Sequence, residues 1–120
     1  PHEISNNPKR IEKNLGDESI LYSDIKLKTN LQEFSCLIID NIGMLSALYN
    51  YSSISYVGGG MGKKGLHNTL EPAYFSKPII IGKNYQKFEE ANEMIKNGNI
   101  ISISNYNEFY NAIELLIDNE

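Results

Sequence analysis

The stretch that most constrains the fold covers residues 53–78, where an apolar segment, a glycine-rich segment and a helix-like segment follow one another. The apolar segment 54–57 predicts a strand that stops at three consecutive glycines, 58–60. Glycine allows the backbone to approach a ligand closely and to adopt positive φ. The helix expected at 68–75 begins with unpaired N–H groups and a positive dipole end. A strand, a glycine loop and a helix start in this order are typical of an anion cradle, most often for phosphate.

The rest of the chain alternates short apolar segments with amphipathic ones. Strands are expected at 19–22, 36–39, 54–57, 78–81 and 99–103. Helices are expected at 8–15, from the Asp40-Asn41 cap through Tyr51, at 68–75, at 85–97 and from the Asn105 cap onward. This alternation predicts an α/β fold with a Rossmann-like parallel sheet and helices on both faces. The length of 120 residues predicts one domain, 1–120.

Ligands of such sheets bind beyond the carboxyl ends of the strands. Loops 40–44, 58–68 and 82–84 each follow an expected strand, so we expect them at one edge. The opening segment Pro1-His2 resembles the end of a loop after a strand that the chain lacks, and it would join them. The sequence therefore predicts one pocket built from four loops.

Two common nucleotide motifs do not fit this loop. Gly60-Met-Gly62-Lys-Lys-Gly65 has the form G-x-G-x-x-G, but the next apolar segment ends without the acid that holds a dinucleotide ribose. A P-loop requires Gly-Lys followed by Ser or Thr, whereas Lys64 follows Lys63 here. The loop is therefore expected to bind a phosphate compound of another kind.

A third pattern fits better. Gly58-Gly59 follows a strand, His67-Asn68-Thr69-Leu70-Glu71-Pro72 opens a helix, and Lys77-Pro78 precedes the next strand. This arrangement resembles the nucleotide-sugar half of GT-B glycosyltransferases. The form His-Asn-x-Leu-Glu-Pro resembles the transferases of 3-deoxy-D-manno-octulosonic acid (Kdo). Segments 40–45 and Pro1-His2 are similar to two further segments of that family, although Met44 replaces an acid, His2 an arginine and Leu66 a glycine.

The resemblance implies that the chain is the C-terminal, donor-binding half of a GT-B enzyme. That family is inverting and transfers Kdo from CMP-Kdo to a lipid A precursor in lipopolysaccharide biosynthesis. The resemblance places the catalytic base, the acceptor site and the membrane anchor in an N-terminal domain missing from this chain. We therefore expect a soluble fragment that is inactive alone and holds no catalytic residue, from an enzyme at the cytoplasmic face of the bacterial inner membrane. The residues expected to contact CMP are Pro1, His2, Ile42, Gly43, Met44, Gly58, Gly59, Gly60, His67, Asn68, Thr69, Leu70 and Glu71.

Several alternatives stay open from the sequence. The net charge of −4 argues against a broad nucleic-acid surface, and no metal-ligand spacing or cofactor motif is seen. Asn68 and Glu71 also match a purely structural helix cap. Another GT-B enzyme that uses a UDP-sugar would share the glycine loop and the acid. A non-enzymatic α/β nucleotide- or phosphate-binding module is the second alternative, although a receiver-like module needs an acid cluster and only Asp40 lies at a strand end.

Overall fold

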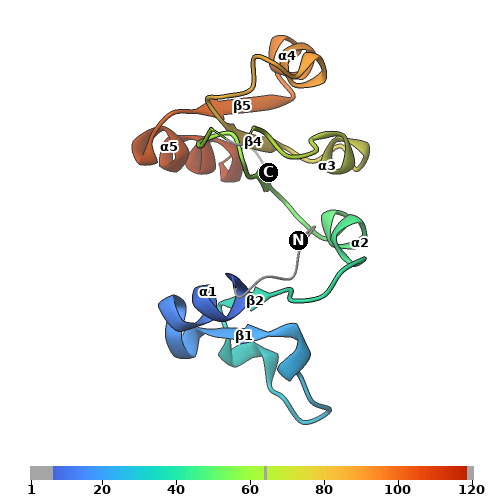
Figure 1. Cartoon of the computed structure of the whole chain (residues 1–120), viewed down its shortest axis with the longest axis vertical. Coiled ribbons are helices and arrows are strands. Elements are labelled where there is room, and N and C mark those ends of the chain that lie inside the picture. The colour runs from blue at the N-terminus through green and yellow to red at the C-terminus, as the bar shows by residue number, and fades with distance from the viewer. Residues whose placement is uncertain (1–6, 64, 119–120) are drawn as a thin grey trace. The chain divides into compact units, whose positions relative to one another are not determined.

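The structure is a computed structural model that describes residues 7–63 and 65–118, and these form two compact units. The first unit ends at Leu45 and the second begins at Ser46, so the boundary falls at the start of one short helix, α2 (Leu45–Tyr49). Parallel strands and helices make up each unit (Figure 1), and the predicted α/β class is confirmed. The prediction of one domain over 1–120 stays a prediction.

The first unit is built on a two-stranded parallel sheet. Strand β1 (Ser19–Leu21) pairs with β2 (Cys36–Ile38), and helix α1 (Asn7–Leu15) contacts both strands. All three residues of β1 are buried. In β2, Cys36 and Leu37 remain partly or largely exposed, so the apolar run is covered less completely than its composition suggests.

The second unit is built on a three-stranded parallel sheet in the order β3-β4-β5. Its strands are β3 (Ser55–Val57), β4 (Ile79–Gly82) and β5 (Ile100–Ile103). Its helices after α2 are α3 (Leu70–Tyr74), α4 (Glu89–Lys96) and α5 (Tyr106–Ile117). Each neighbouring pair of strands is joined by a helical crossover, which is the connection that parallel strands require. The five strands of the described residues thus divide over two sheets, whereas the sequence predicts one.

The central strand β4 explains why helices cover both faces of this sheet. Side chains alternate along a strand, so Ile79 and Ile81 point to one face and Ile80 to the other. Ile79 and Ile81 pack in a cluster with residues of α3 and α4, whereas Ile80 packs with Ile103 and with Ala112 of α5. All three isoleucines are at most 2% exposed, and burial of each contributes about 1.5–3 kcal/mol.

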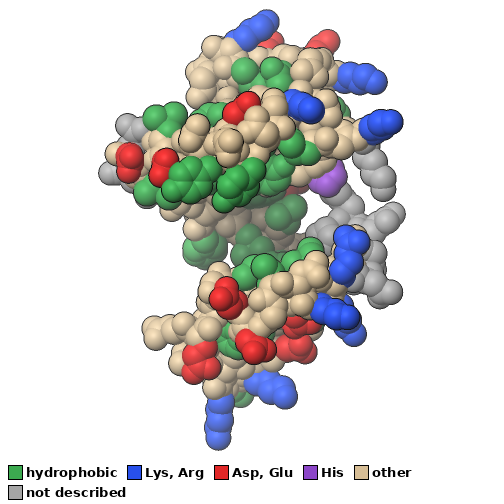
Figure 2. All heavy atoms as spheres, turned by 90° about the vertical axis from the view of Figure 1, so that its left-hand side faces the viewer, with side chains coloured by type: hydrophobic (Ala, Val, Ile, Leu, Met, Phe, Trp, Pro, Cys, Tyr) green, Lys and Arg blue, Asp and Glu red, His purple; other side chains and the backbone are tan. Residues whose placement is uncertain are grey.

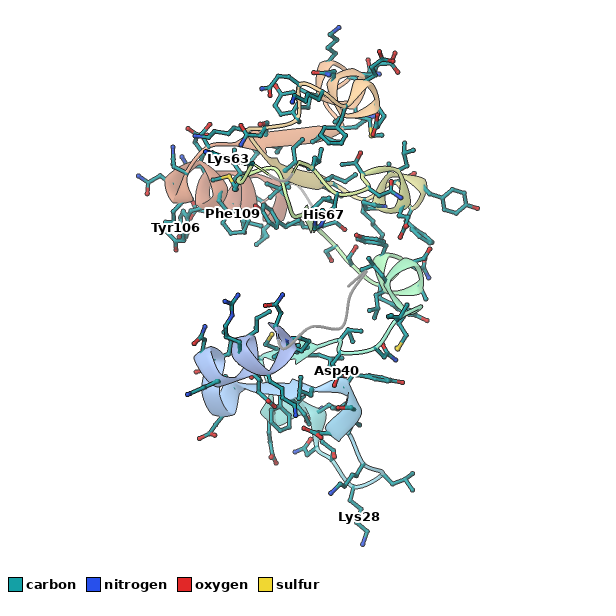
Figure 3. The ribbon with its side chains drawn as sticks, in the orientation of Figure 1. Lys28, Asp40, Lys63, His67, Tyr106 and Phe109 are labelled. Carbon is teal, nitrogen blue, oxygen red and sulfur yellow. The ribbon has the colours of Figure 1, made fainter. Side chains whose placement is uncertain are left out.

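On the face of the sheet that α5 covers, aromatic side chains at the edge strand β3 are partly exposed to solvent. The ring of Phe109 on α5 (Figure 3) meets the ring of Tyr56 on β3 edge to face, with centroids 5.7 Å apart. Tyr56, Tyr106 and Tyr110 keep large exposed fractions, and Figure 2 shows apolar side chains, in green, on the surface of this unit. The edge of the sheet is therefore covered only in part by its own unit.

Three helices are shorter than the sequence predicts. Helix α3 covers Leu70–Tyr74 of the expected 68–75. Helix α2 begins at Leu45, because Gly43 has φ +101° and Asp40, the expected cap, bonds to Ser23 instead. Helix α4 begins at Glu89 instead of near residue 85. The Asn92 amide donates to the carbonyls of Phe88 and Gln86, which holds the preceding segment in a turn.

Candidate functional site

The glycine loop after β3 folds back on itself. The Gly62 N–H donates to the Gly59 carbonyl at 3.2 Å, and the His67 N–H donates to the Gly58 carbonyl at 3.1 Å. Gly59 has φ +89°, and a Cβ at this position would overlap the carbonyl oxygen of Gly65. Only glycine fits this position without moving the backbone, so the loop conformation explains one of the three consecutive glycines directly.

A second glycine contact joins this loop to the end of β4. A Cβ at Gly60 would lie 2.9 Å from both the backbone nitrogen and the carbonyl oxygen of Gly82. Asn84 strengthens the junction, because its N–H donates to the Gly60 carbonyl at 2.8 Å and its side-chain amide donates to the Gly62 carbonyl at 3.1 Å. The loops after β3 and β4, which the sequence places at one edge, are in direct contact.

The segment before α3 is held by its own side chains. The Asn68 side-chain oxygen accepts the Leu70 N–H at 2.9 Å, and the Asn68 amide donates to the Glu71 carboxylate at 3.2 Å. The expected capping role of Asn68 is therefore observed, with the helix itself beginning at Leu70. This arrangement fixes the direction of the Glu71 carboxylate, so a structural cap and a ligand contact are compatible at these residues.

Exposure separates the predicted contact residues of the second unit into two groups. His67, Asn68 and Leu70 are exposed, and Glu71, Gly58 and Gly59 are partly exposed. Gly60 is buried, and Thr69 is only 1% exposed. The Thr69 hydroxyl is buried without a hydrogen-bond partner among the described residues. The His67 ring, labelled in Figure 3, lies close to Gly58: a Cβ on Gly58 would be 3.7 Å from the ring Nδ1.

Tyr49 connects α2 to this site electrostatically. Partial burial raises the pKa of the Tyr49 phenol above its ordinary value, and the negative charge of Glu71 raises it further. Both effects disfavour the phenolate next to a carboxylate. The phenol thus stays protonated beside Glu71, and the sequence gives no sign of this pairing because the two residues are far apart in the chain.

The other predicted residues precede the second unit in the sequence. Pro1 and His2 fall outside the described residues. Ile42, Gly43 and Met44 follow β2, where Ile42 is 66% exposed and the Met44 sulfur accepts the Asn41 side-chain amide at 3.1 Å. Their participation in a pocket with the glycine loop stays a prediction.

Asp40, just before this segment, is held by Ser23. Its carboxylate accepts the Ser23 N–H at 3.0 Å and the Ser23 hydroxyl at 2.6 Å. These hydrogen bonds, the hydroxyl bond first, lower the pKa of Asp40 below 3.8. Asp40 therefore anchors the end of β2 to the loop after β1.

The cavities lined by described residues of the second unit include two that matter for a ligand. One of about 310 Å³ lies between the glycine loop and the loop after β4, and its lining includes Lys63 and Lys87. The other, of about 360 Å³, lies at the amino ends of β4 and β5 beside Lys77 and Asn99. Only the first lies at the edge where the sequence predicts a ligand. Lys87 was missed as a candidate because its segment reads as the first turn of a helix.

The described residues were compared with the requirements of a metal site and of a membrane-spanning helix. Within 7–63 and 65–118, no three His, Cys, Asp or Glu side chains gather in a way that could hold a metal ion. None of the described helices is both long and apolar enough to cross a membrane.

No family model matches the chain, but several curated proteins do. A bifunctional glycosyltransferase/methyltransferase of Fusobacterium nucleatum is 35% identical over 102 residues, which are 84% of this chain and 16% of that protein. The 3-deoxy-D-manno-octulosonic acid transferase of Rickettsia typhi is 34% identical over 82 residues, 68% of this chain and 18% of that protein. That of Haemophilus influenzae is 43% identical over 56 residues, 47% of this chain and 13% of that protein. The chain spans less than a fifth of the length of each of these three relatives.

A solved structure agrees with these relatives. The crystal structure of the C-terminal CMP-Kdo binding domain of WaaA from Acinetobacter baumannii matches with a TM-score of 0.82 and 20% identity, over 98% of this chain and 62% of that one. At this identity the match establishes the fold, which is that of the C-terminal half of a GT-B protein. Together with the sequence relatives, it confirms the resemblance predicted above. The chain is a relative of the 3-deoxy-D-manno-octulosonic acid transferases and corresponds to a C-terminal part of such a protein.

Proposed function

We propose that the protein to which this chain belongs transfers Kdo from CMP-Kdo to a lipid A precursor in lipopolysaccharide biosynthesis. This chain would supply the CMP-binding part. One observation carries the proposal: the segment His67-Asn68-Thr69-Leu70-Glu71-Pro72 follows a closed glycine loop at the carboxyl edge of a parallel sheet, in a relative of Kdo transferases. Ligands of open parallel sheets bind at this edge.

Different residues of the second unit bind different parts of the nucleotide. The backbone of the glycine loop, in the conformation that the positive φ of Gly59 allows, presents N–H groups to the phosphate. Glu71 accepts hydrogen bonds from the ribose hydroxyls, while its bond to Asn68 keeps the carboxylate in place. Thr69 is buried, so its role is to pack beneath the segment that carries Asn68 and Leu70.

Transfer of Kdo requires stabilisation of CMP as the leaving group, because negative charge develops on its phosphate. A hydroxyl of the acceptor attacks the anomeric carbon of Kdo, the bond between this carbon and the phosphate oxygen breaks, and CMP leaves with the electron pair. Backbone N–H groups aimed at that oxygen stabilise the charge as it develops. The proton of the hydroxyl passes to a carboxylate base that the resemblance assigns to an N-terminal domain. This chain therefore acts by binding and by stabilising the leaving group.

The acceptor and the location follow from the same resemblance. A lipid A precursor would bind through the N-terminal domain, which would also carry the membrane anchor. The whole enzyme would act at the cytoplasmic face of the bacterial inner membrane.

The proposal is tested by titrating the chain with CMP, UMP and AMP while amide chemical shifts are recorded. CMP is expected to shift the amides of 58–60 and 68–71 more strongly than UMP or AMP. Glu71→Gln should weaken CMP binding about tenfold, which is the loss expected for a hydrogen bond to a charged group. Glu93→Gln, on the exposed surface of α4, is the matched control and should leave the affinity unchanged.

Three other outcomes would decide against the proposal. Equal binding of UMP would favour a GT-B enzyme that uses a UDP-sugar. Equal binding of all three nucleotides would favour a general phosphate-binding module without base selectivity. A full-length protein that binds no nucleotide at millimolar concentration would make the glycine loop a purely structural element.

A further inference from the structure

The cavity of about 310 Å³ beside the glycine loop has walls that are built and fixed. Its lining includes Gly62, Lys63 and Gly65 of the glycine loop and Asn84, Lys87 and Phe88 of the loop after β4. Asn84 bonds to the Gly60 and Gly62 carbonyls, and the Phe88 N–H donates to the Tyr85 carbonyl at 2.8 Å. Hydrogen bonds within the protein therefore support both walls.

The charge of this cavity is positive. Its described lining contains two lysines and no carboxylate. Neither Lys63 nor Lys87 makes an ion pair with a carboxylate of the described residues. Tyr106, the first residue of α5, marks the end of the sheet where the strands finish. Lys63 lies at this same end (Figure 3). An anion bound at the carboxyl edge of the sheet would therefore contact the ammonium groups of Lys63 and Lys87, which no carboxylate of the described residues neutralises.

The donor under the proposed function carries a second anionic group. Kdo is a sugar acid whose carboxylate is attached to the anomeric carbon, the same carbon that bears the phosphate in CMP-Kdo. The carboxylate and the phosphate must therefore bind next to each other. Gly62, in the cavity wall, is hydrogen-bonded to Gly59 of the predicted phosphate-binding glycines, so the cavity and these glycines share one loop.

We infer that Lys63 and Lys87 form a subsite for the carboxylate of the sugar acid, a role that rests on the proposed function. The glycine backbone holds the phosphate, and the two ammonium groups hold the carboxylate on the neighbouring side of the loop. Such a subsite selects sugar acids over neutral sugars, because a neutral group leaves both lysines without a partner. The donor is thereby recognised by its sugar as well as by its nucleotide.

The experiment compares the affinities of CMP-Kdo and CMP for the full-length protein without acceptor. Lys63→Met and Lys87→Met remove the charge but keep most of the side-chain length. Each is expected to weaken CMP-Kdo binding about tenfold and to leave CMP binding within about twofold. Lys83→Met is the matched control, because Lys83 is exposed on the same loop and does not line the cavity, and it should change neither affinity.

The outcomes separate this inference from the function on which it rests. If Lys63→Met and Lys87→Met weaken CMP and CMP-Kdo equally, the lysines bind the phosphate and the carboxylate subsite is wrong. If they change neither affinity, the cavity takes no part in donor binding and the inference is also wrong. A wild-type protein that does not bind CMP would instead overturn the proposed function, whatever the lysine variants do.

Discussion

Gly60 and Gly62 lie two residues apart on one loop but have different surroundings. A methyl group on Gly60 meets the backbone of Gly82 at 2.9 Å, whereas one on Gly62 meets no atom within 4 Å. The Gly60 contact involves backbone on both sides, which cannot rotate away as a side chain could. The requirement for glycine in this loop is therefore specific to position.

Gly60→Ala is expected to destabilise the protein by about 1–3 kcal/mol, the usual cost of forcing extra volume into a packed site. Gly62→Ala is the matched control and should change the free energy of unfolding by less than about 0.5 kcal/mol. Urea denaturation of both variants measures the difference. Equal stability of the two would show that the Gly60–Gly82 contact relaxes easily.

Ser23→Ala is expected to raise the pKa of Asp40 toward 3.8, because the hydroxyl bond that most lowers it is removed. Since the folded-state pKa of Asp40 is lowered, its stabilising contribution is present above pH 3.8 and is lost as the pH falls through the folded-state value. The variant should lack part of this acid dependence. Carboxyl carbon shifts of Asp40 followed from pH 6 to pH 2 test this, with Ser35→Ala as the control. An unchanged Asp40 titration would contradict the hydrogen bond.

At the scale of elements, the start of α5 is determined by a local sequence pattern. The Asn105 side chain accepts the Glu108 N–H at 3.0 Å, and the Glu108 carboxylate accepts the Ser104 N–H at 2.7 Å. The sequence predicts the cap at Asn105, and this prediction is confirmed, with Glu108 as its partner three residues later. Local polar spacing was sufficient because both partners lie within one turn.

Asn105→Ala is expected to cost about 1 kcal/mol of stability through the lost cap. Asn107→Ala removes an exposed asparagine of the same helix that has no capping role, and should be neutral or slightly stabilising because alanine favours helices. Thermal unfolding followed by circular dichroism distinguishes the two. A smaller loss for Asn105→Ala than for Asn107→Ala would contradict the cap.

The starts of α2 and α4 could not be predicted in the same way. Asp40 caps no helix because its partner, Ser23, is 17 residues away in the chain. The start of α4 is delayed by Asn92, whose amide turns back to the Phe88 and Gln86 carbonyls. Both are contacts that compete with the helix, and periodicity of apolar residues carries no information about them.

At the scale of the whole molecule, the sequence predicts the α/β class, the glycine loop and the segment before α3 as a site. It does not predict the division of the strands into two sheets, because strand pairing across the chain depends on which edges meet. The cavity between Lys63 and Lys87 is also absent from the sequence pattern. Its two lysines come from different loops, and only the fold brings those loops together.

The 120-residue chain is expected to bind CMP but not to transfer Kdo. CMP at about 100 times its dissociation constant should raise the free energy of unfolding by about 2.7 kcal/mol, since it binds only the folded form. A thermal-shift titration measures this, and incubation with CMP-Kdo and a lipid A precursor measures transfer. Transfer by the 120 residues alone would show that a catalytic base lies within this chain and would contradict the assignment of the base to another domain.

The backbone contact between Gly60 and Gly82 also limits where this loop can change its length. Residues before Gly60 run from β3 into that contact, so an insertion there would push the loop off the end of β4. Beyond it, Gly62 has open space around it. An insertion after Gly62 would extend only the tip of the loop. Proteins that share this junction are therefore expected to differ in loop length at the tip and to keep a constant number of residues between β3 and Gly60.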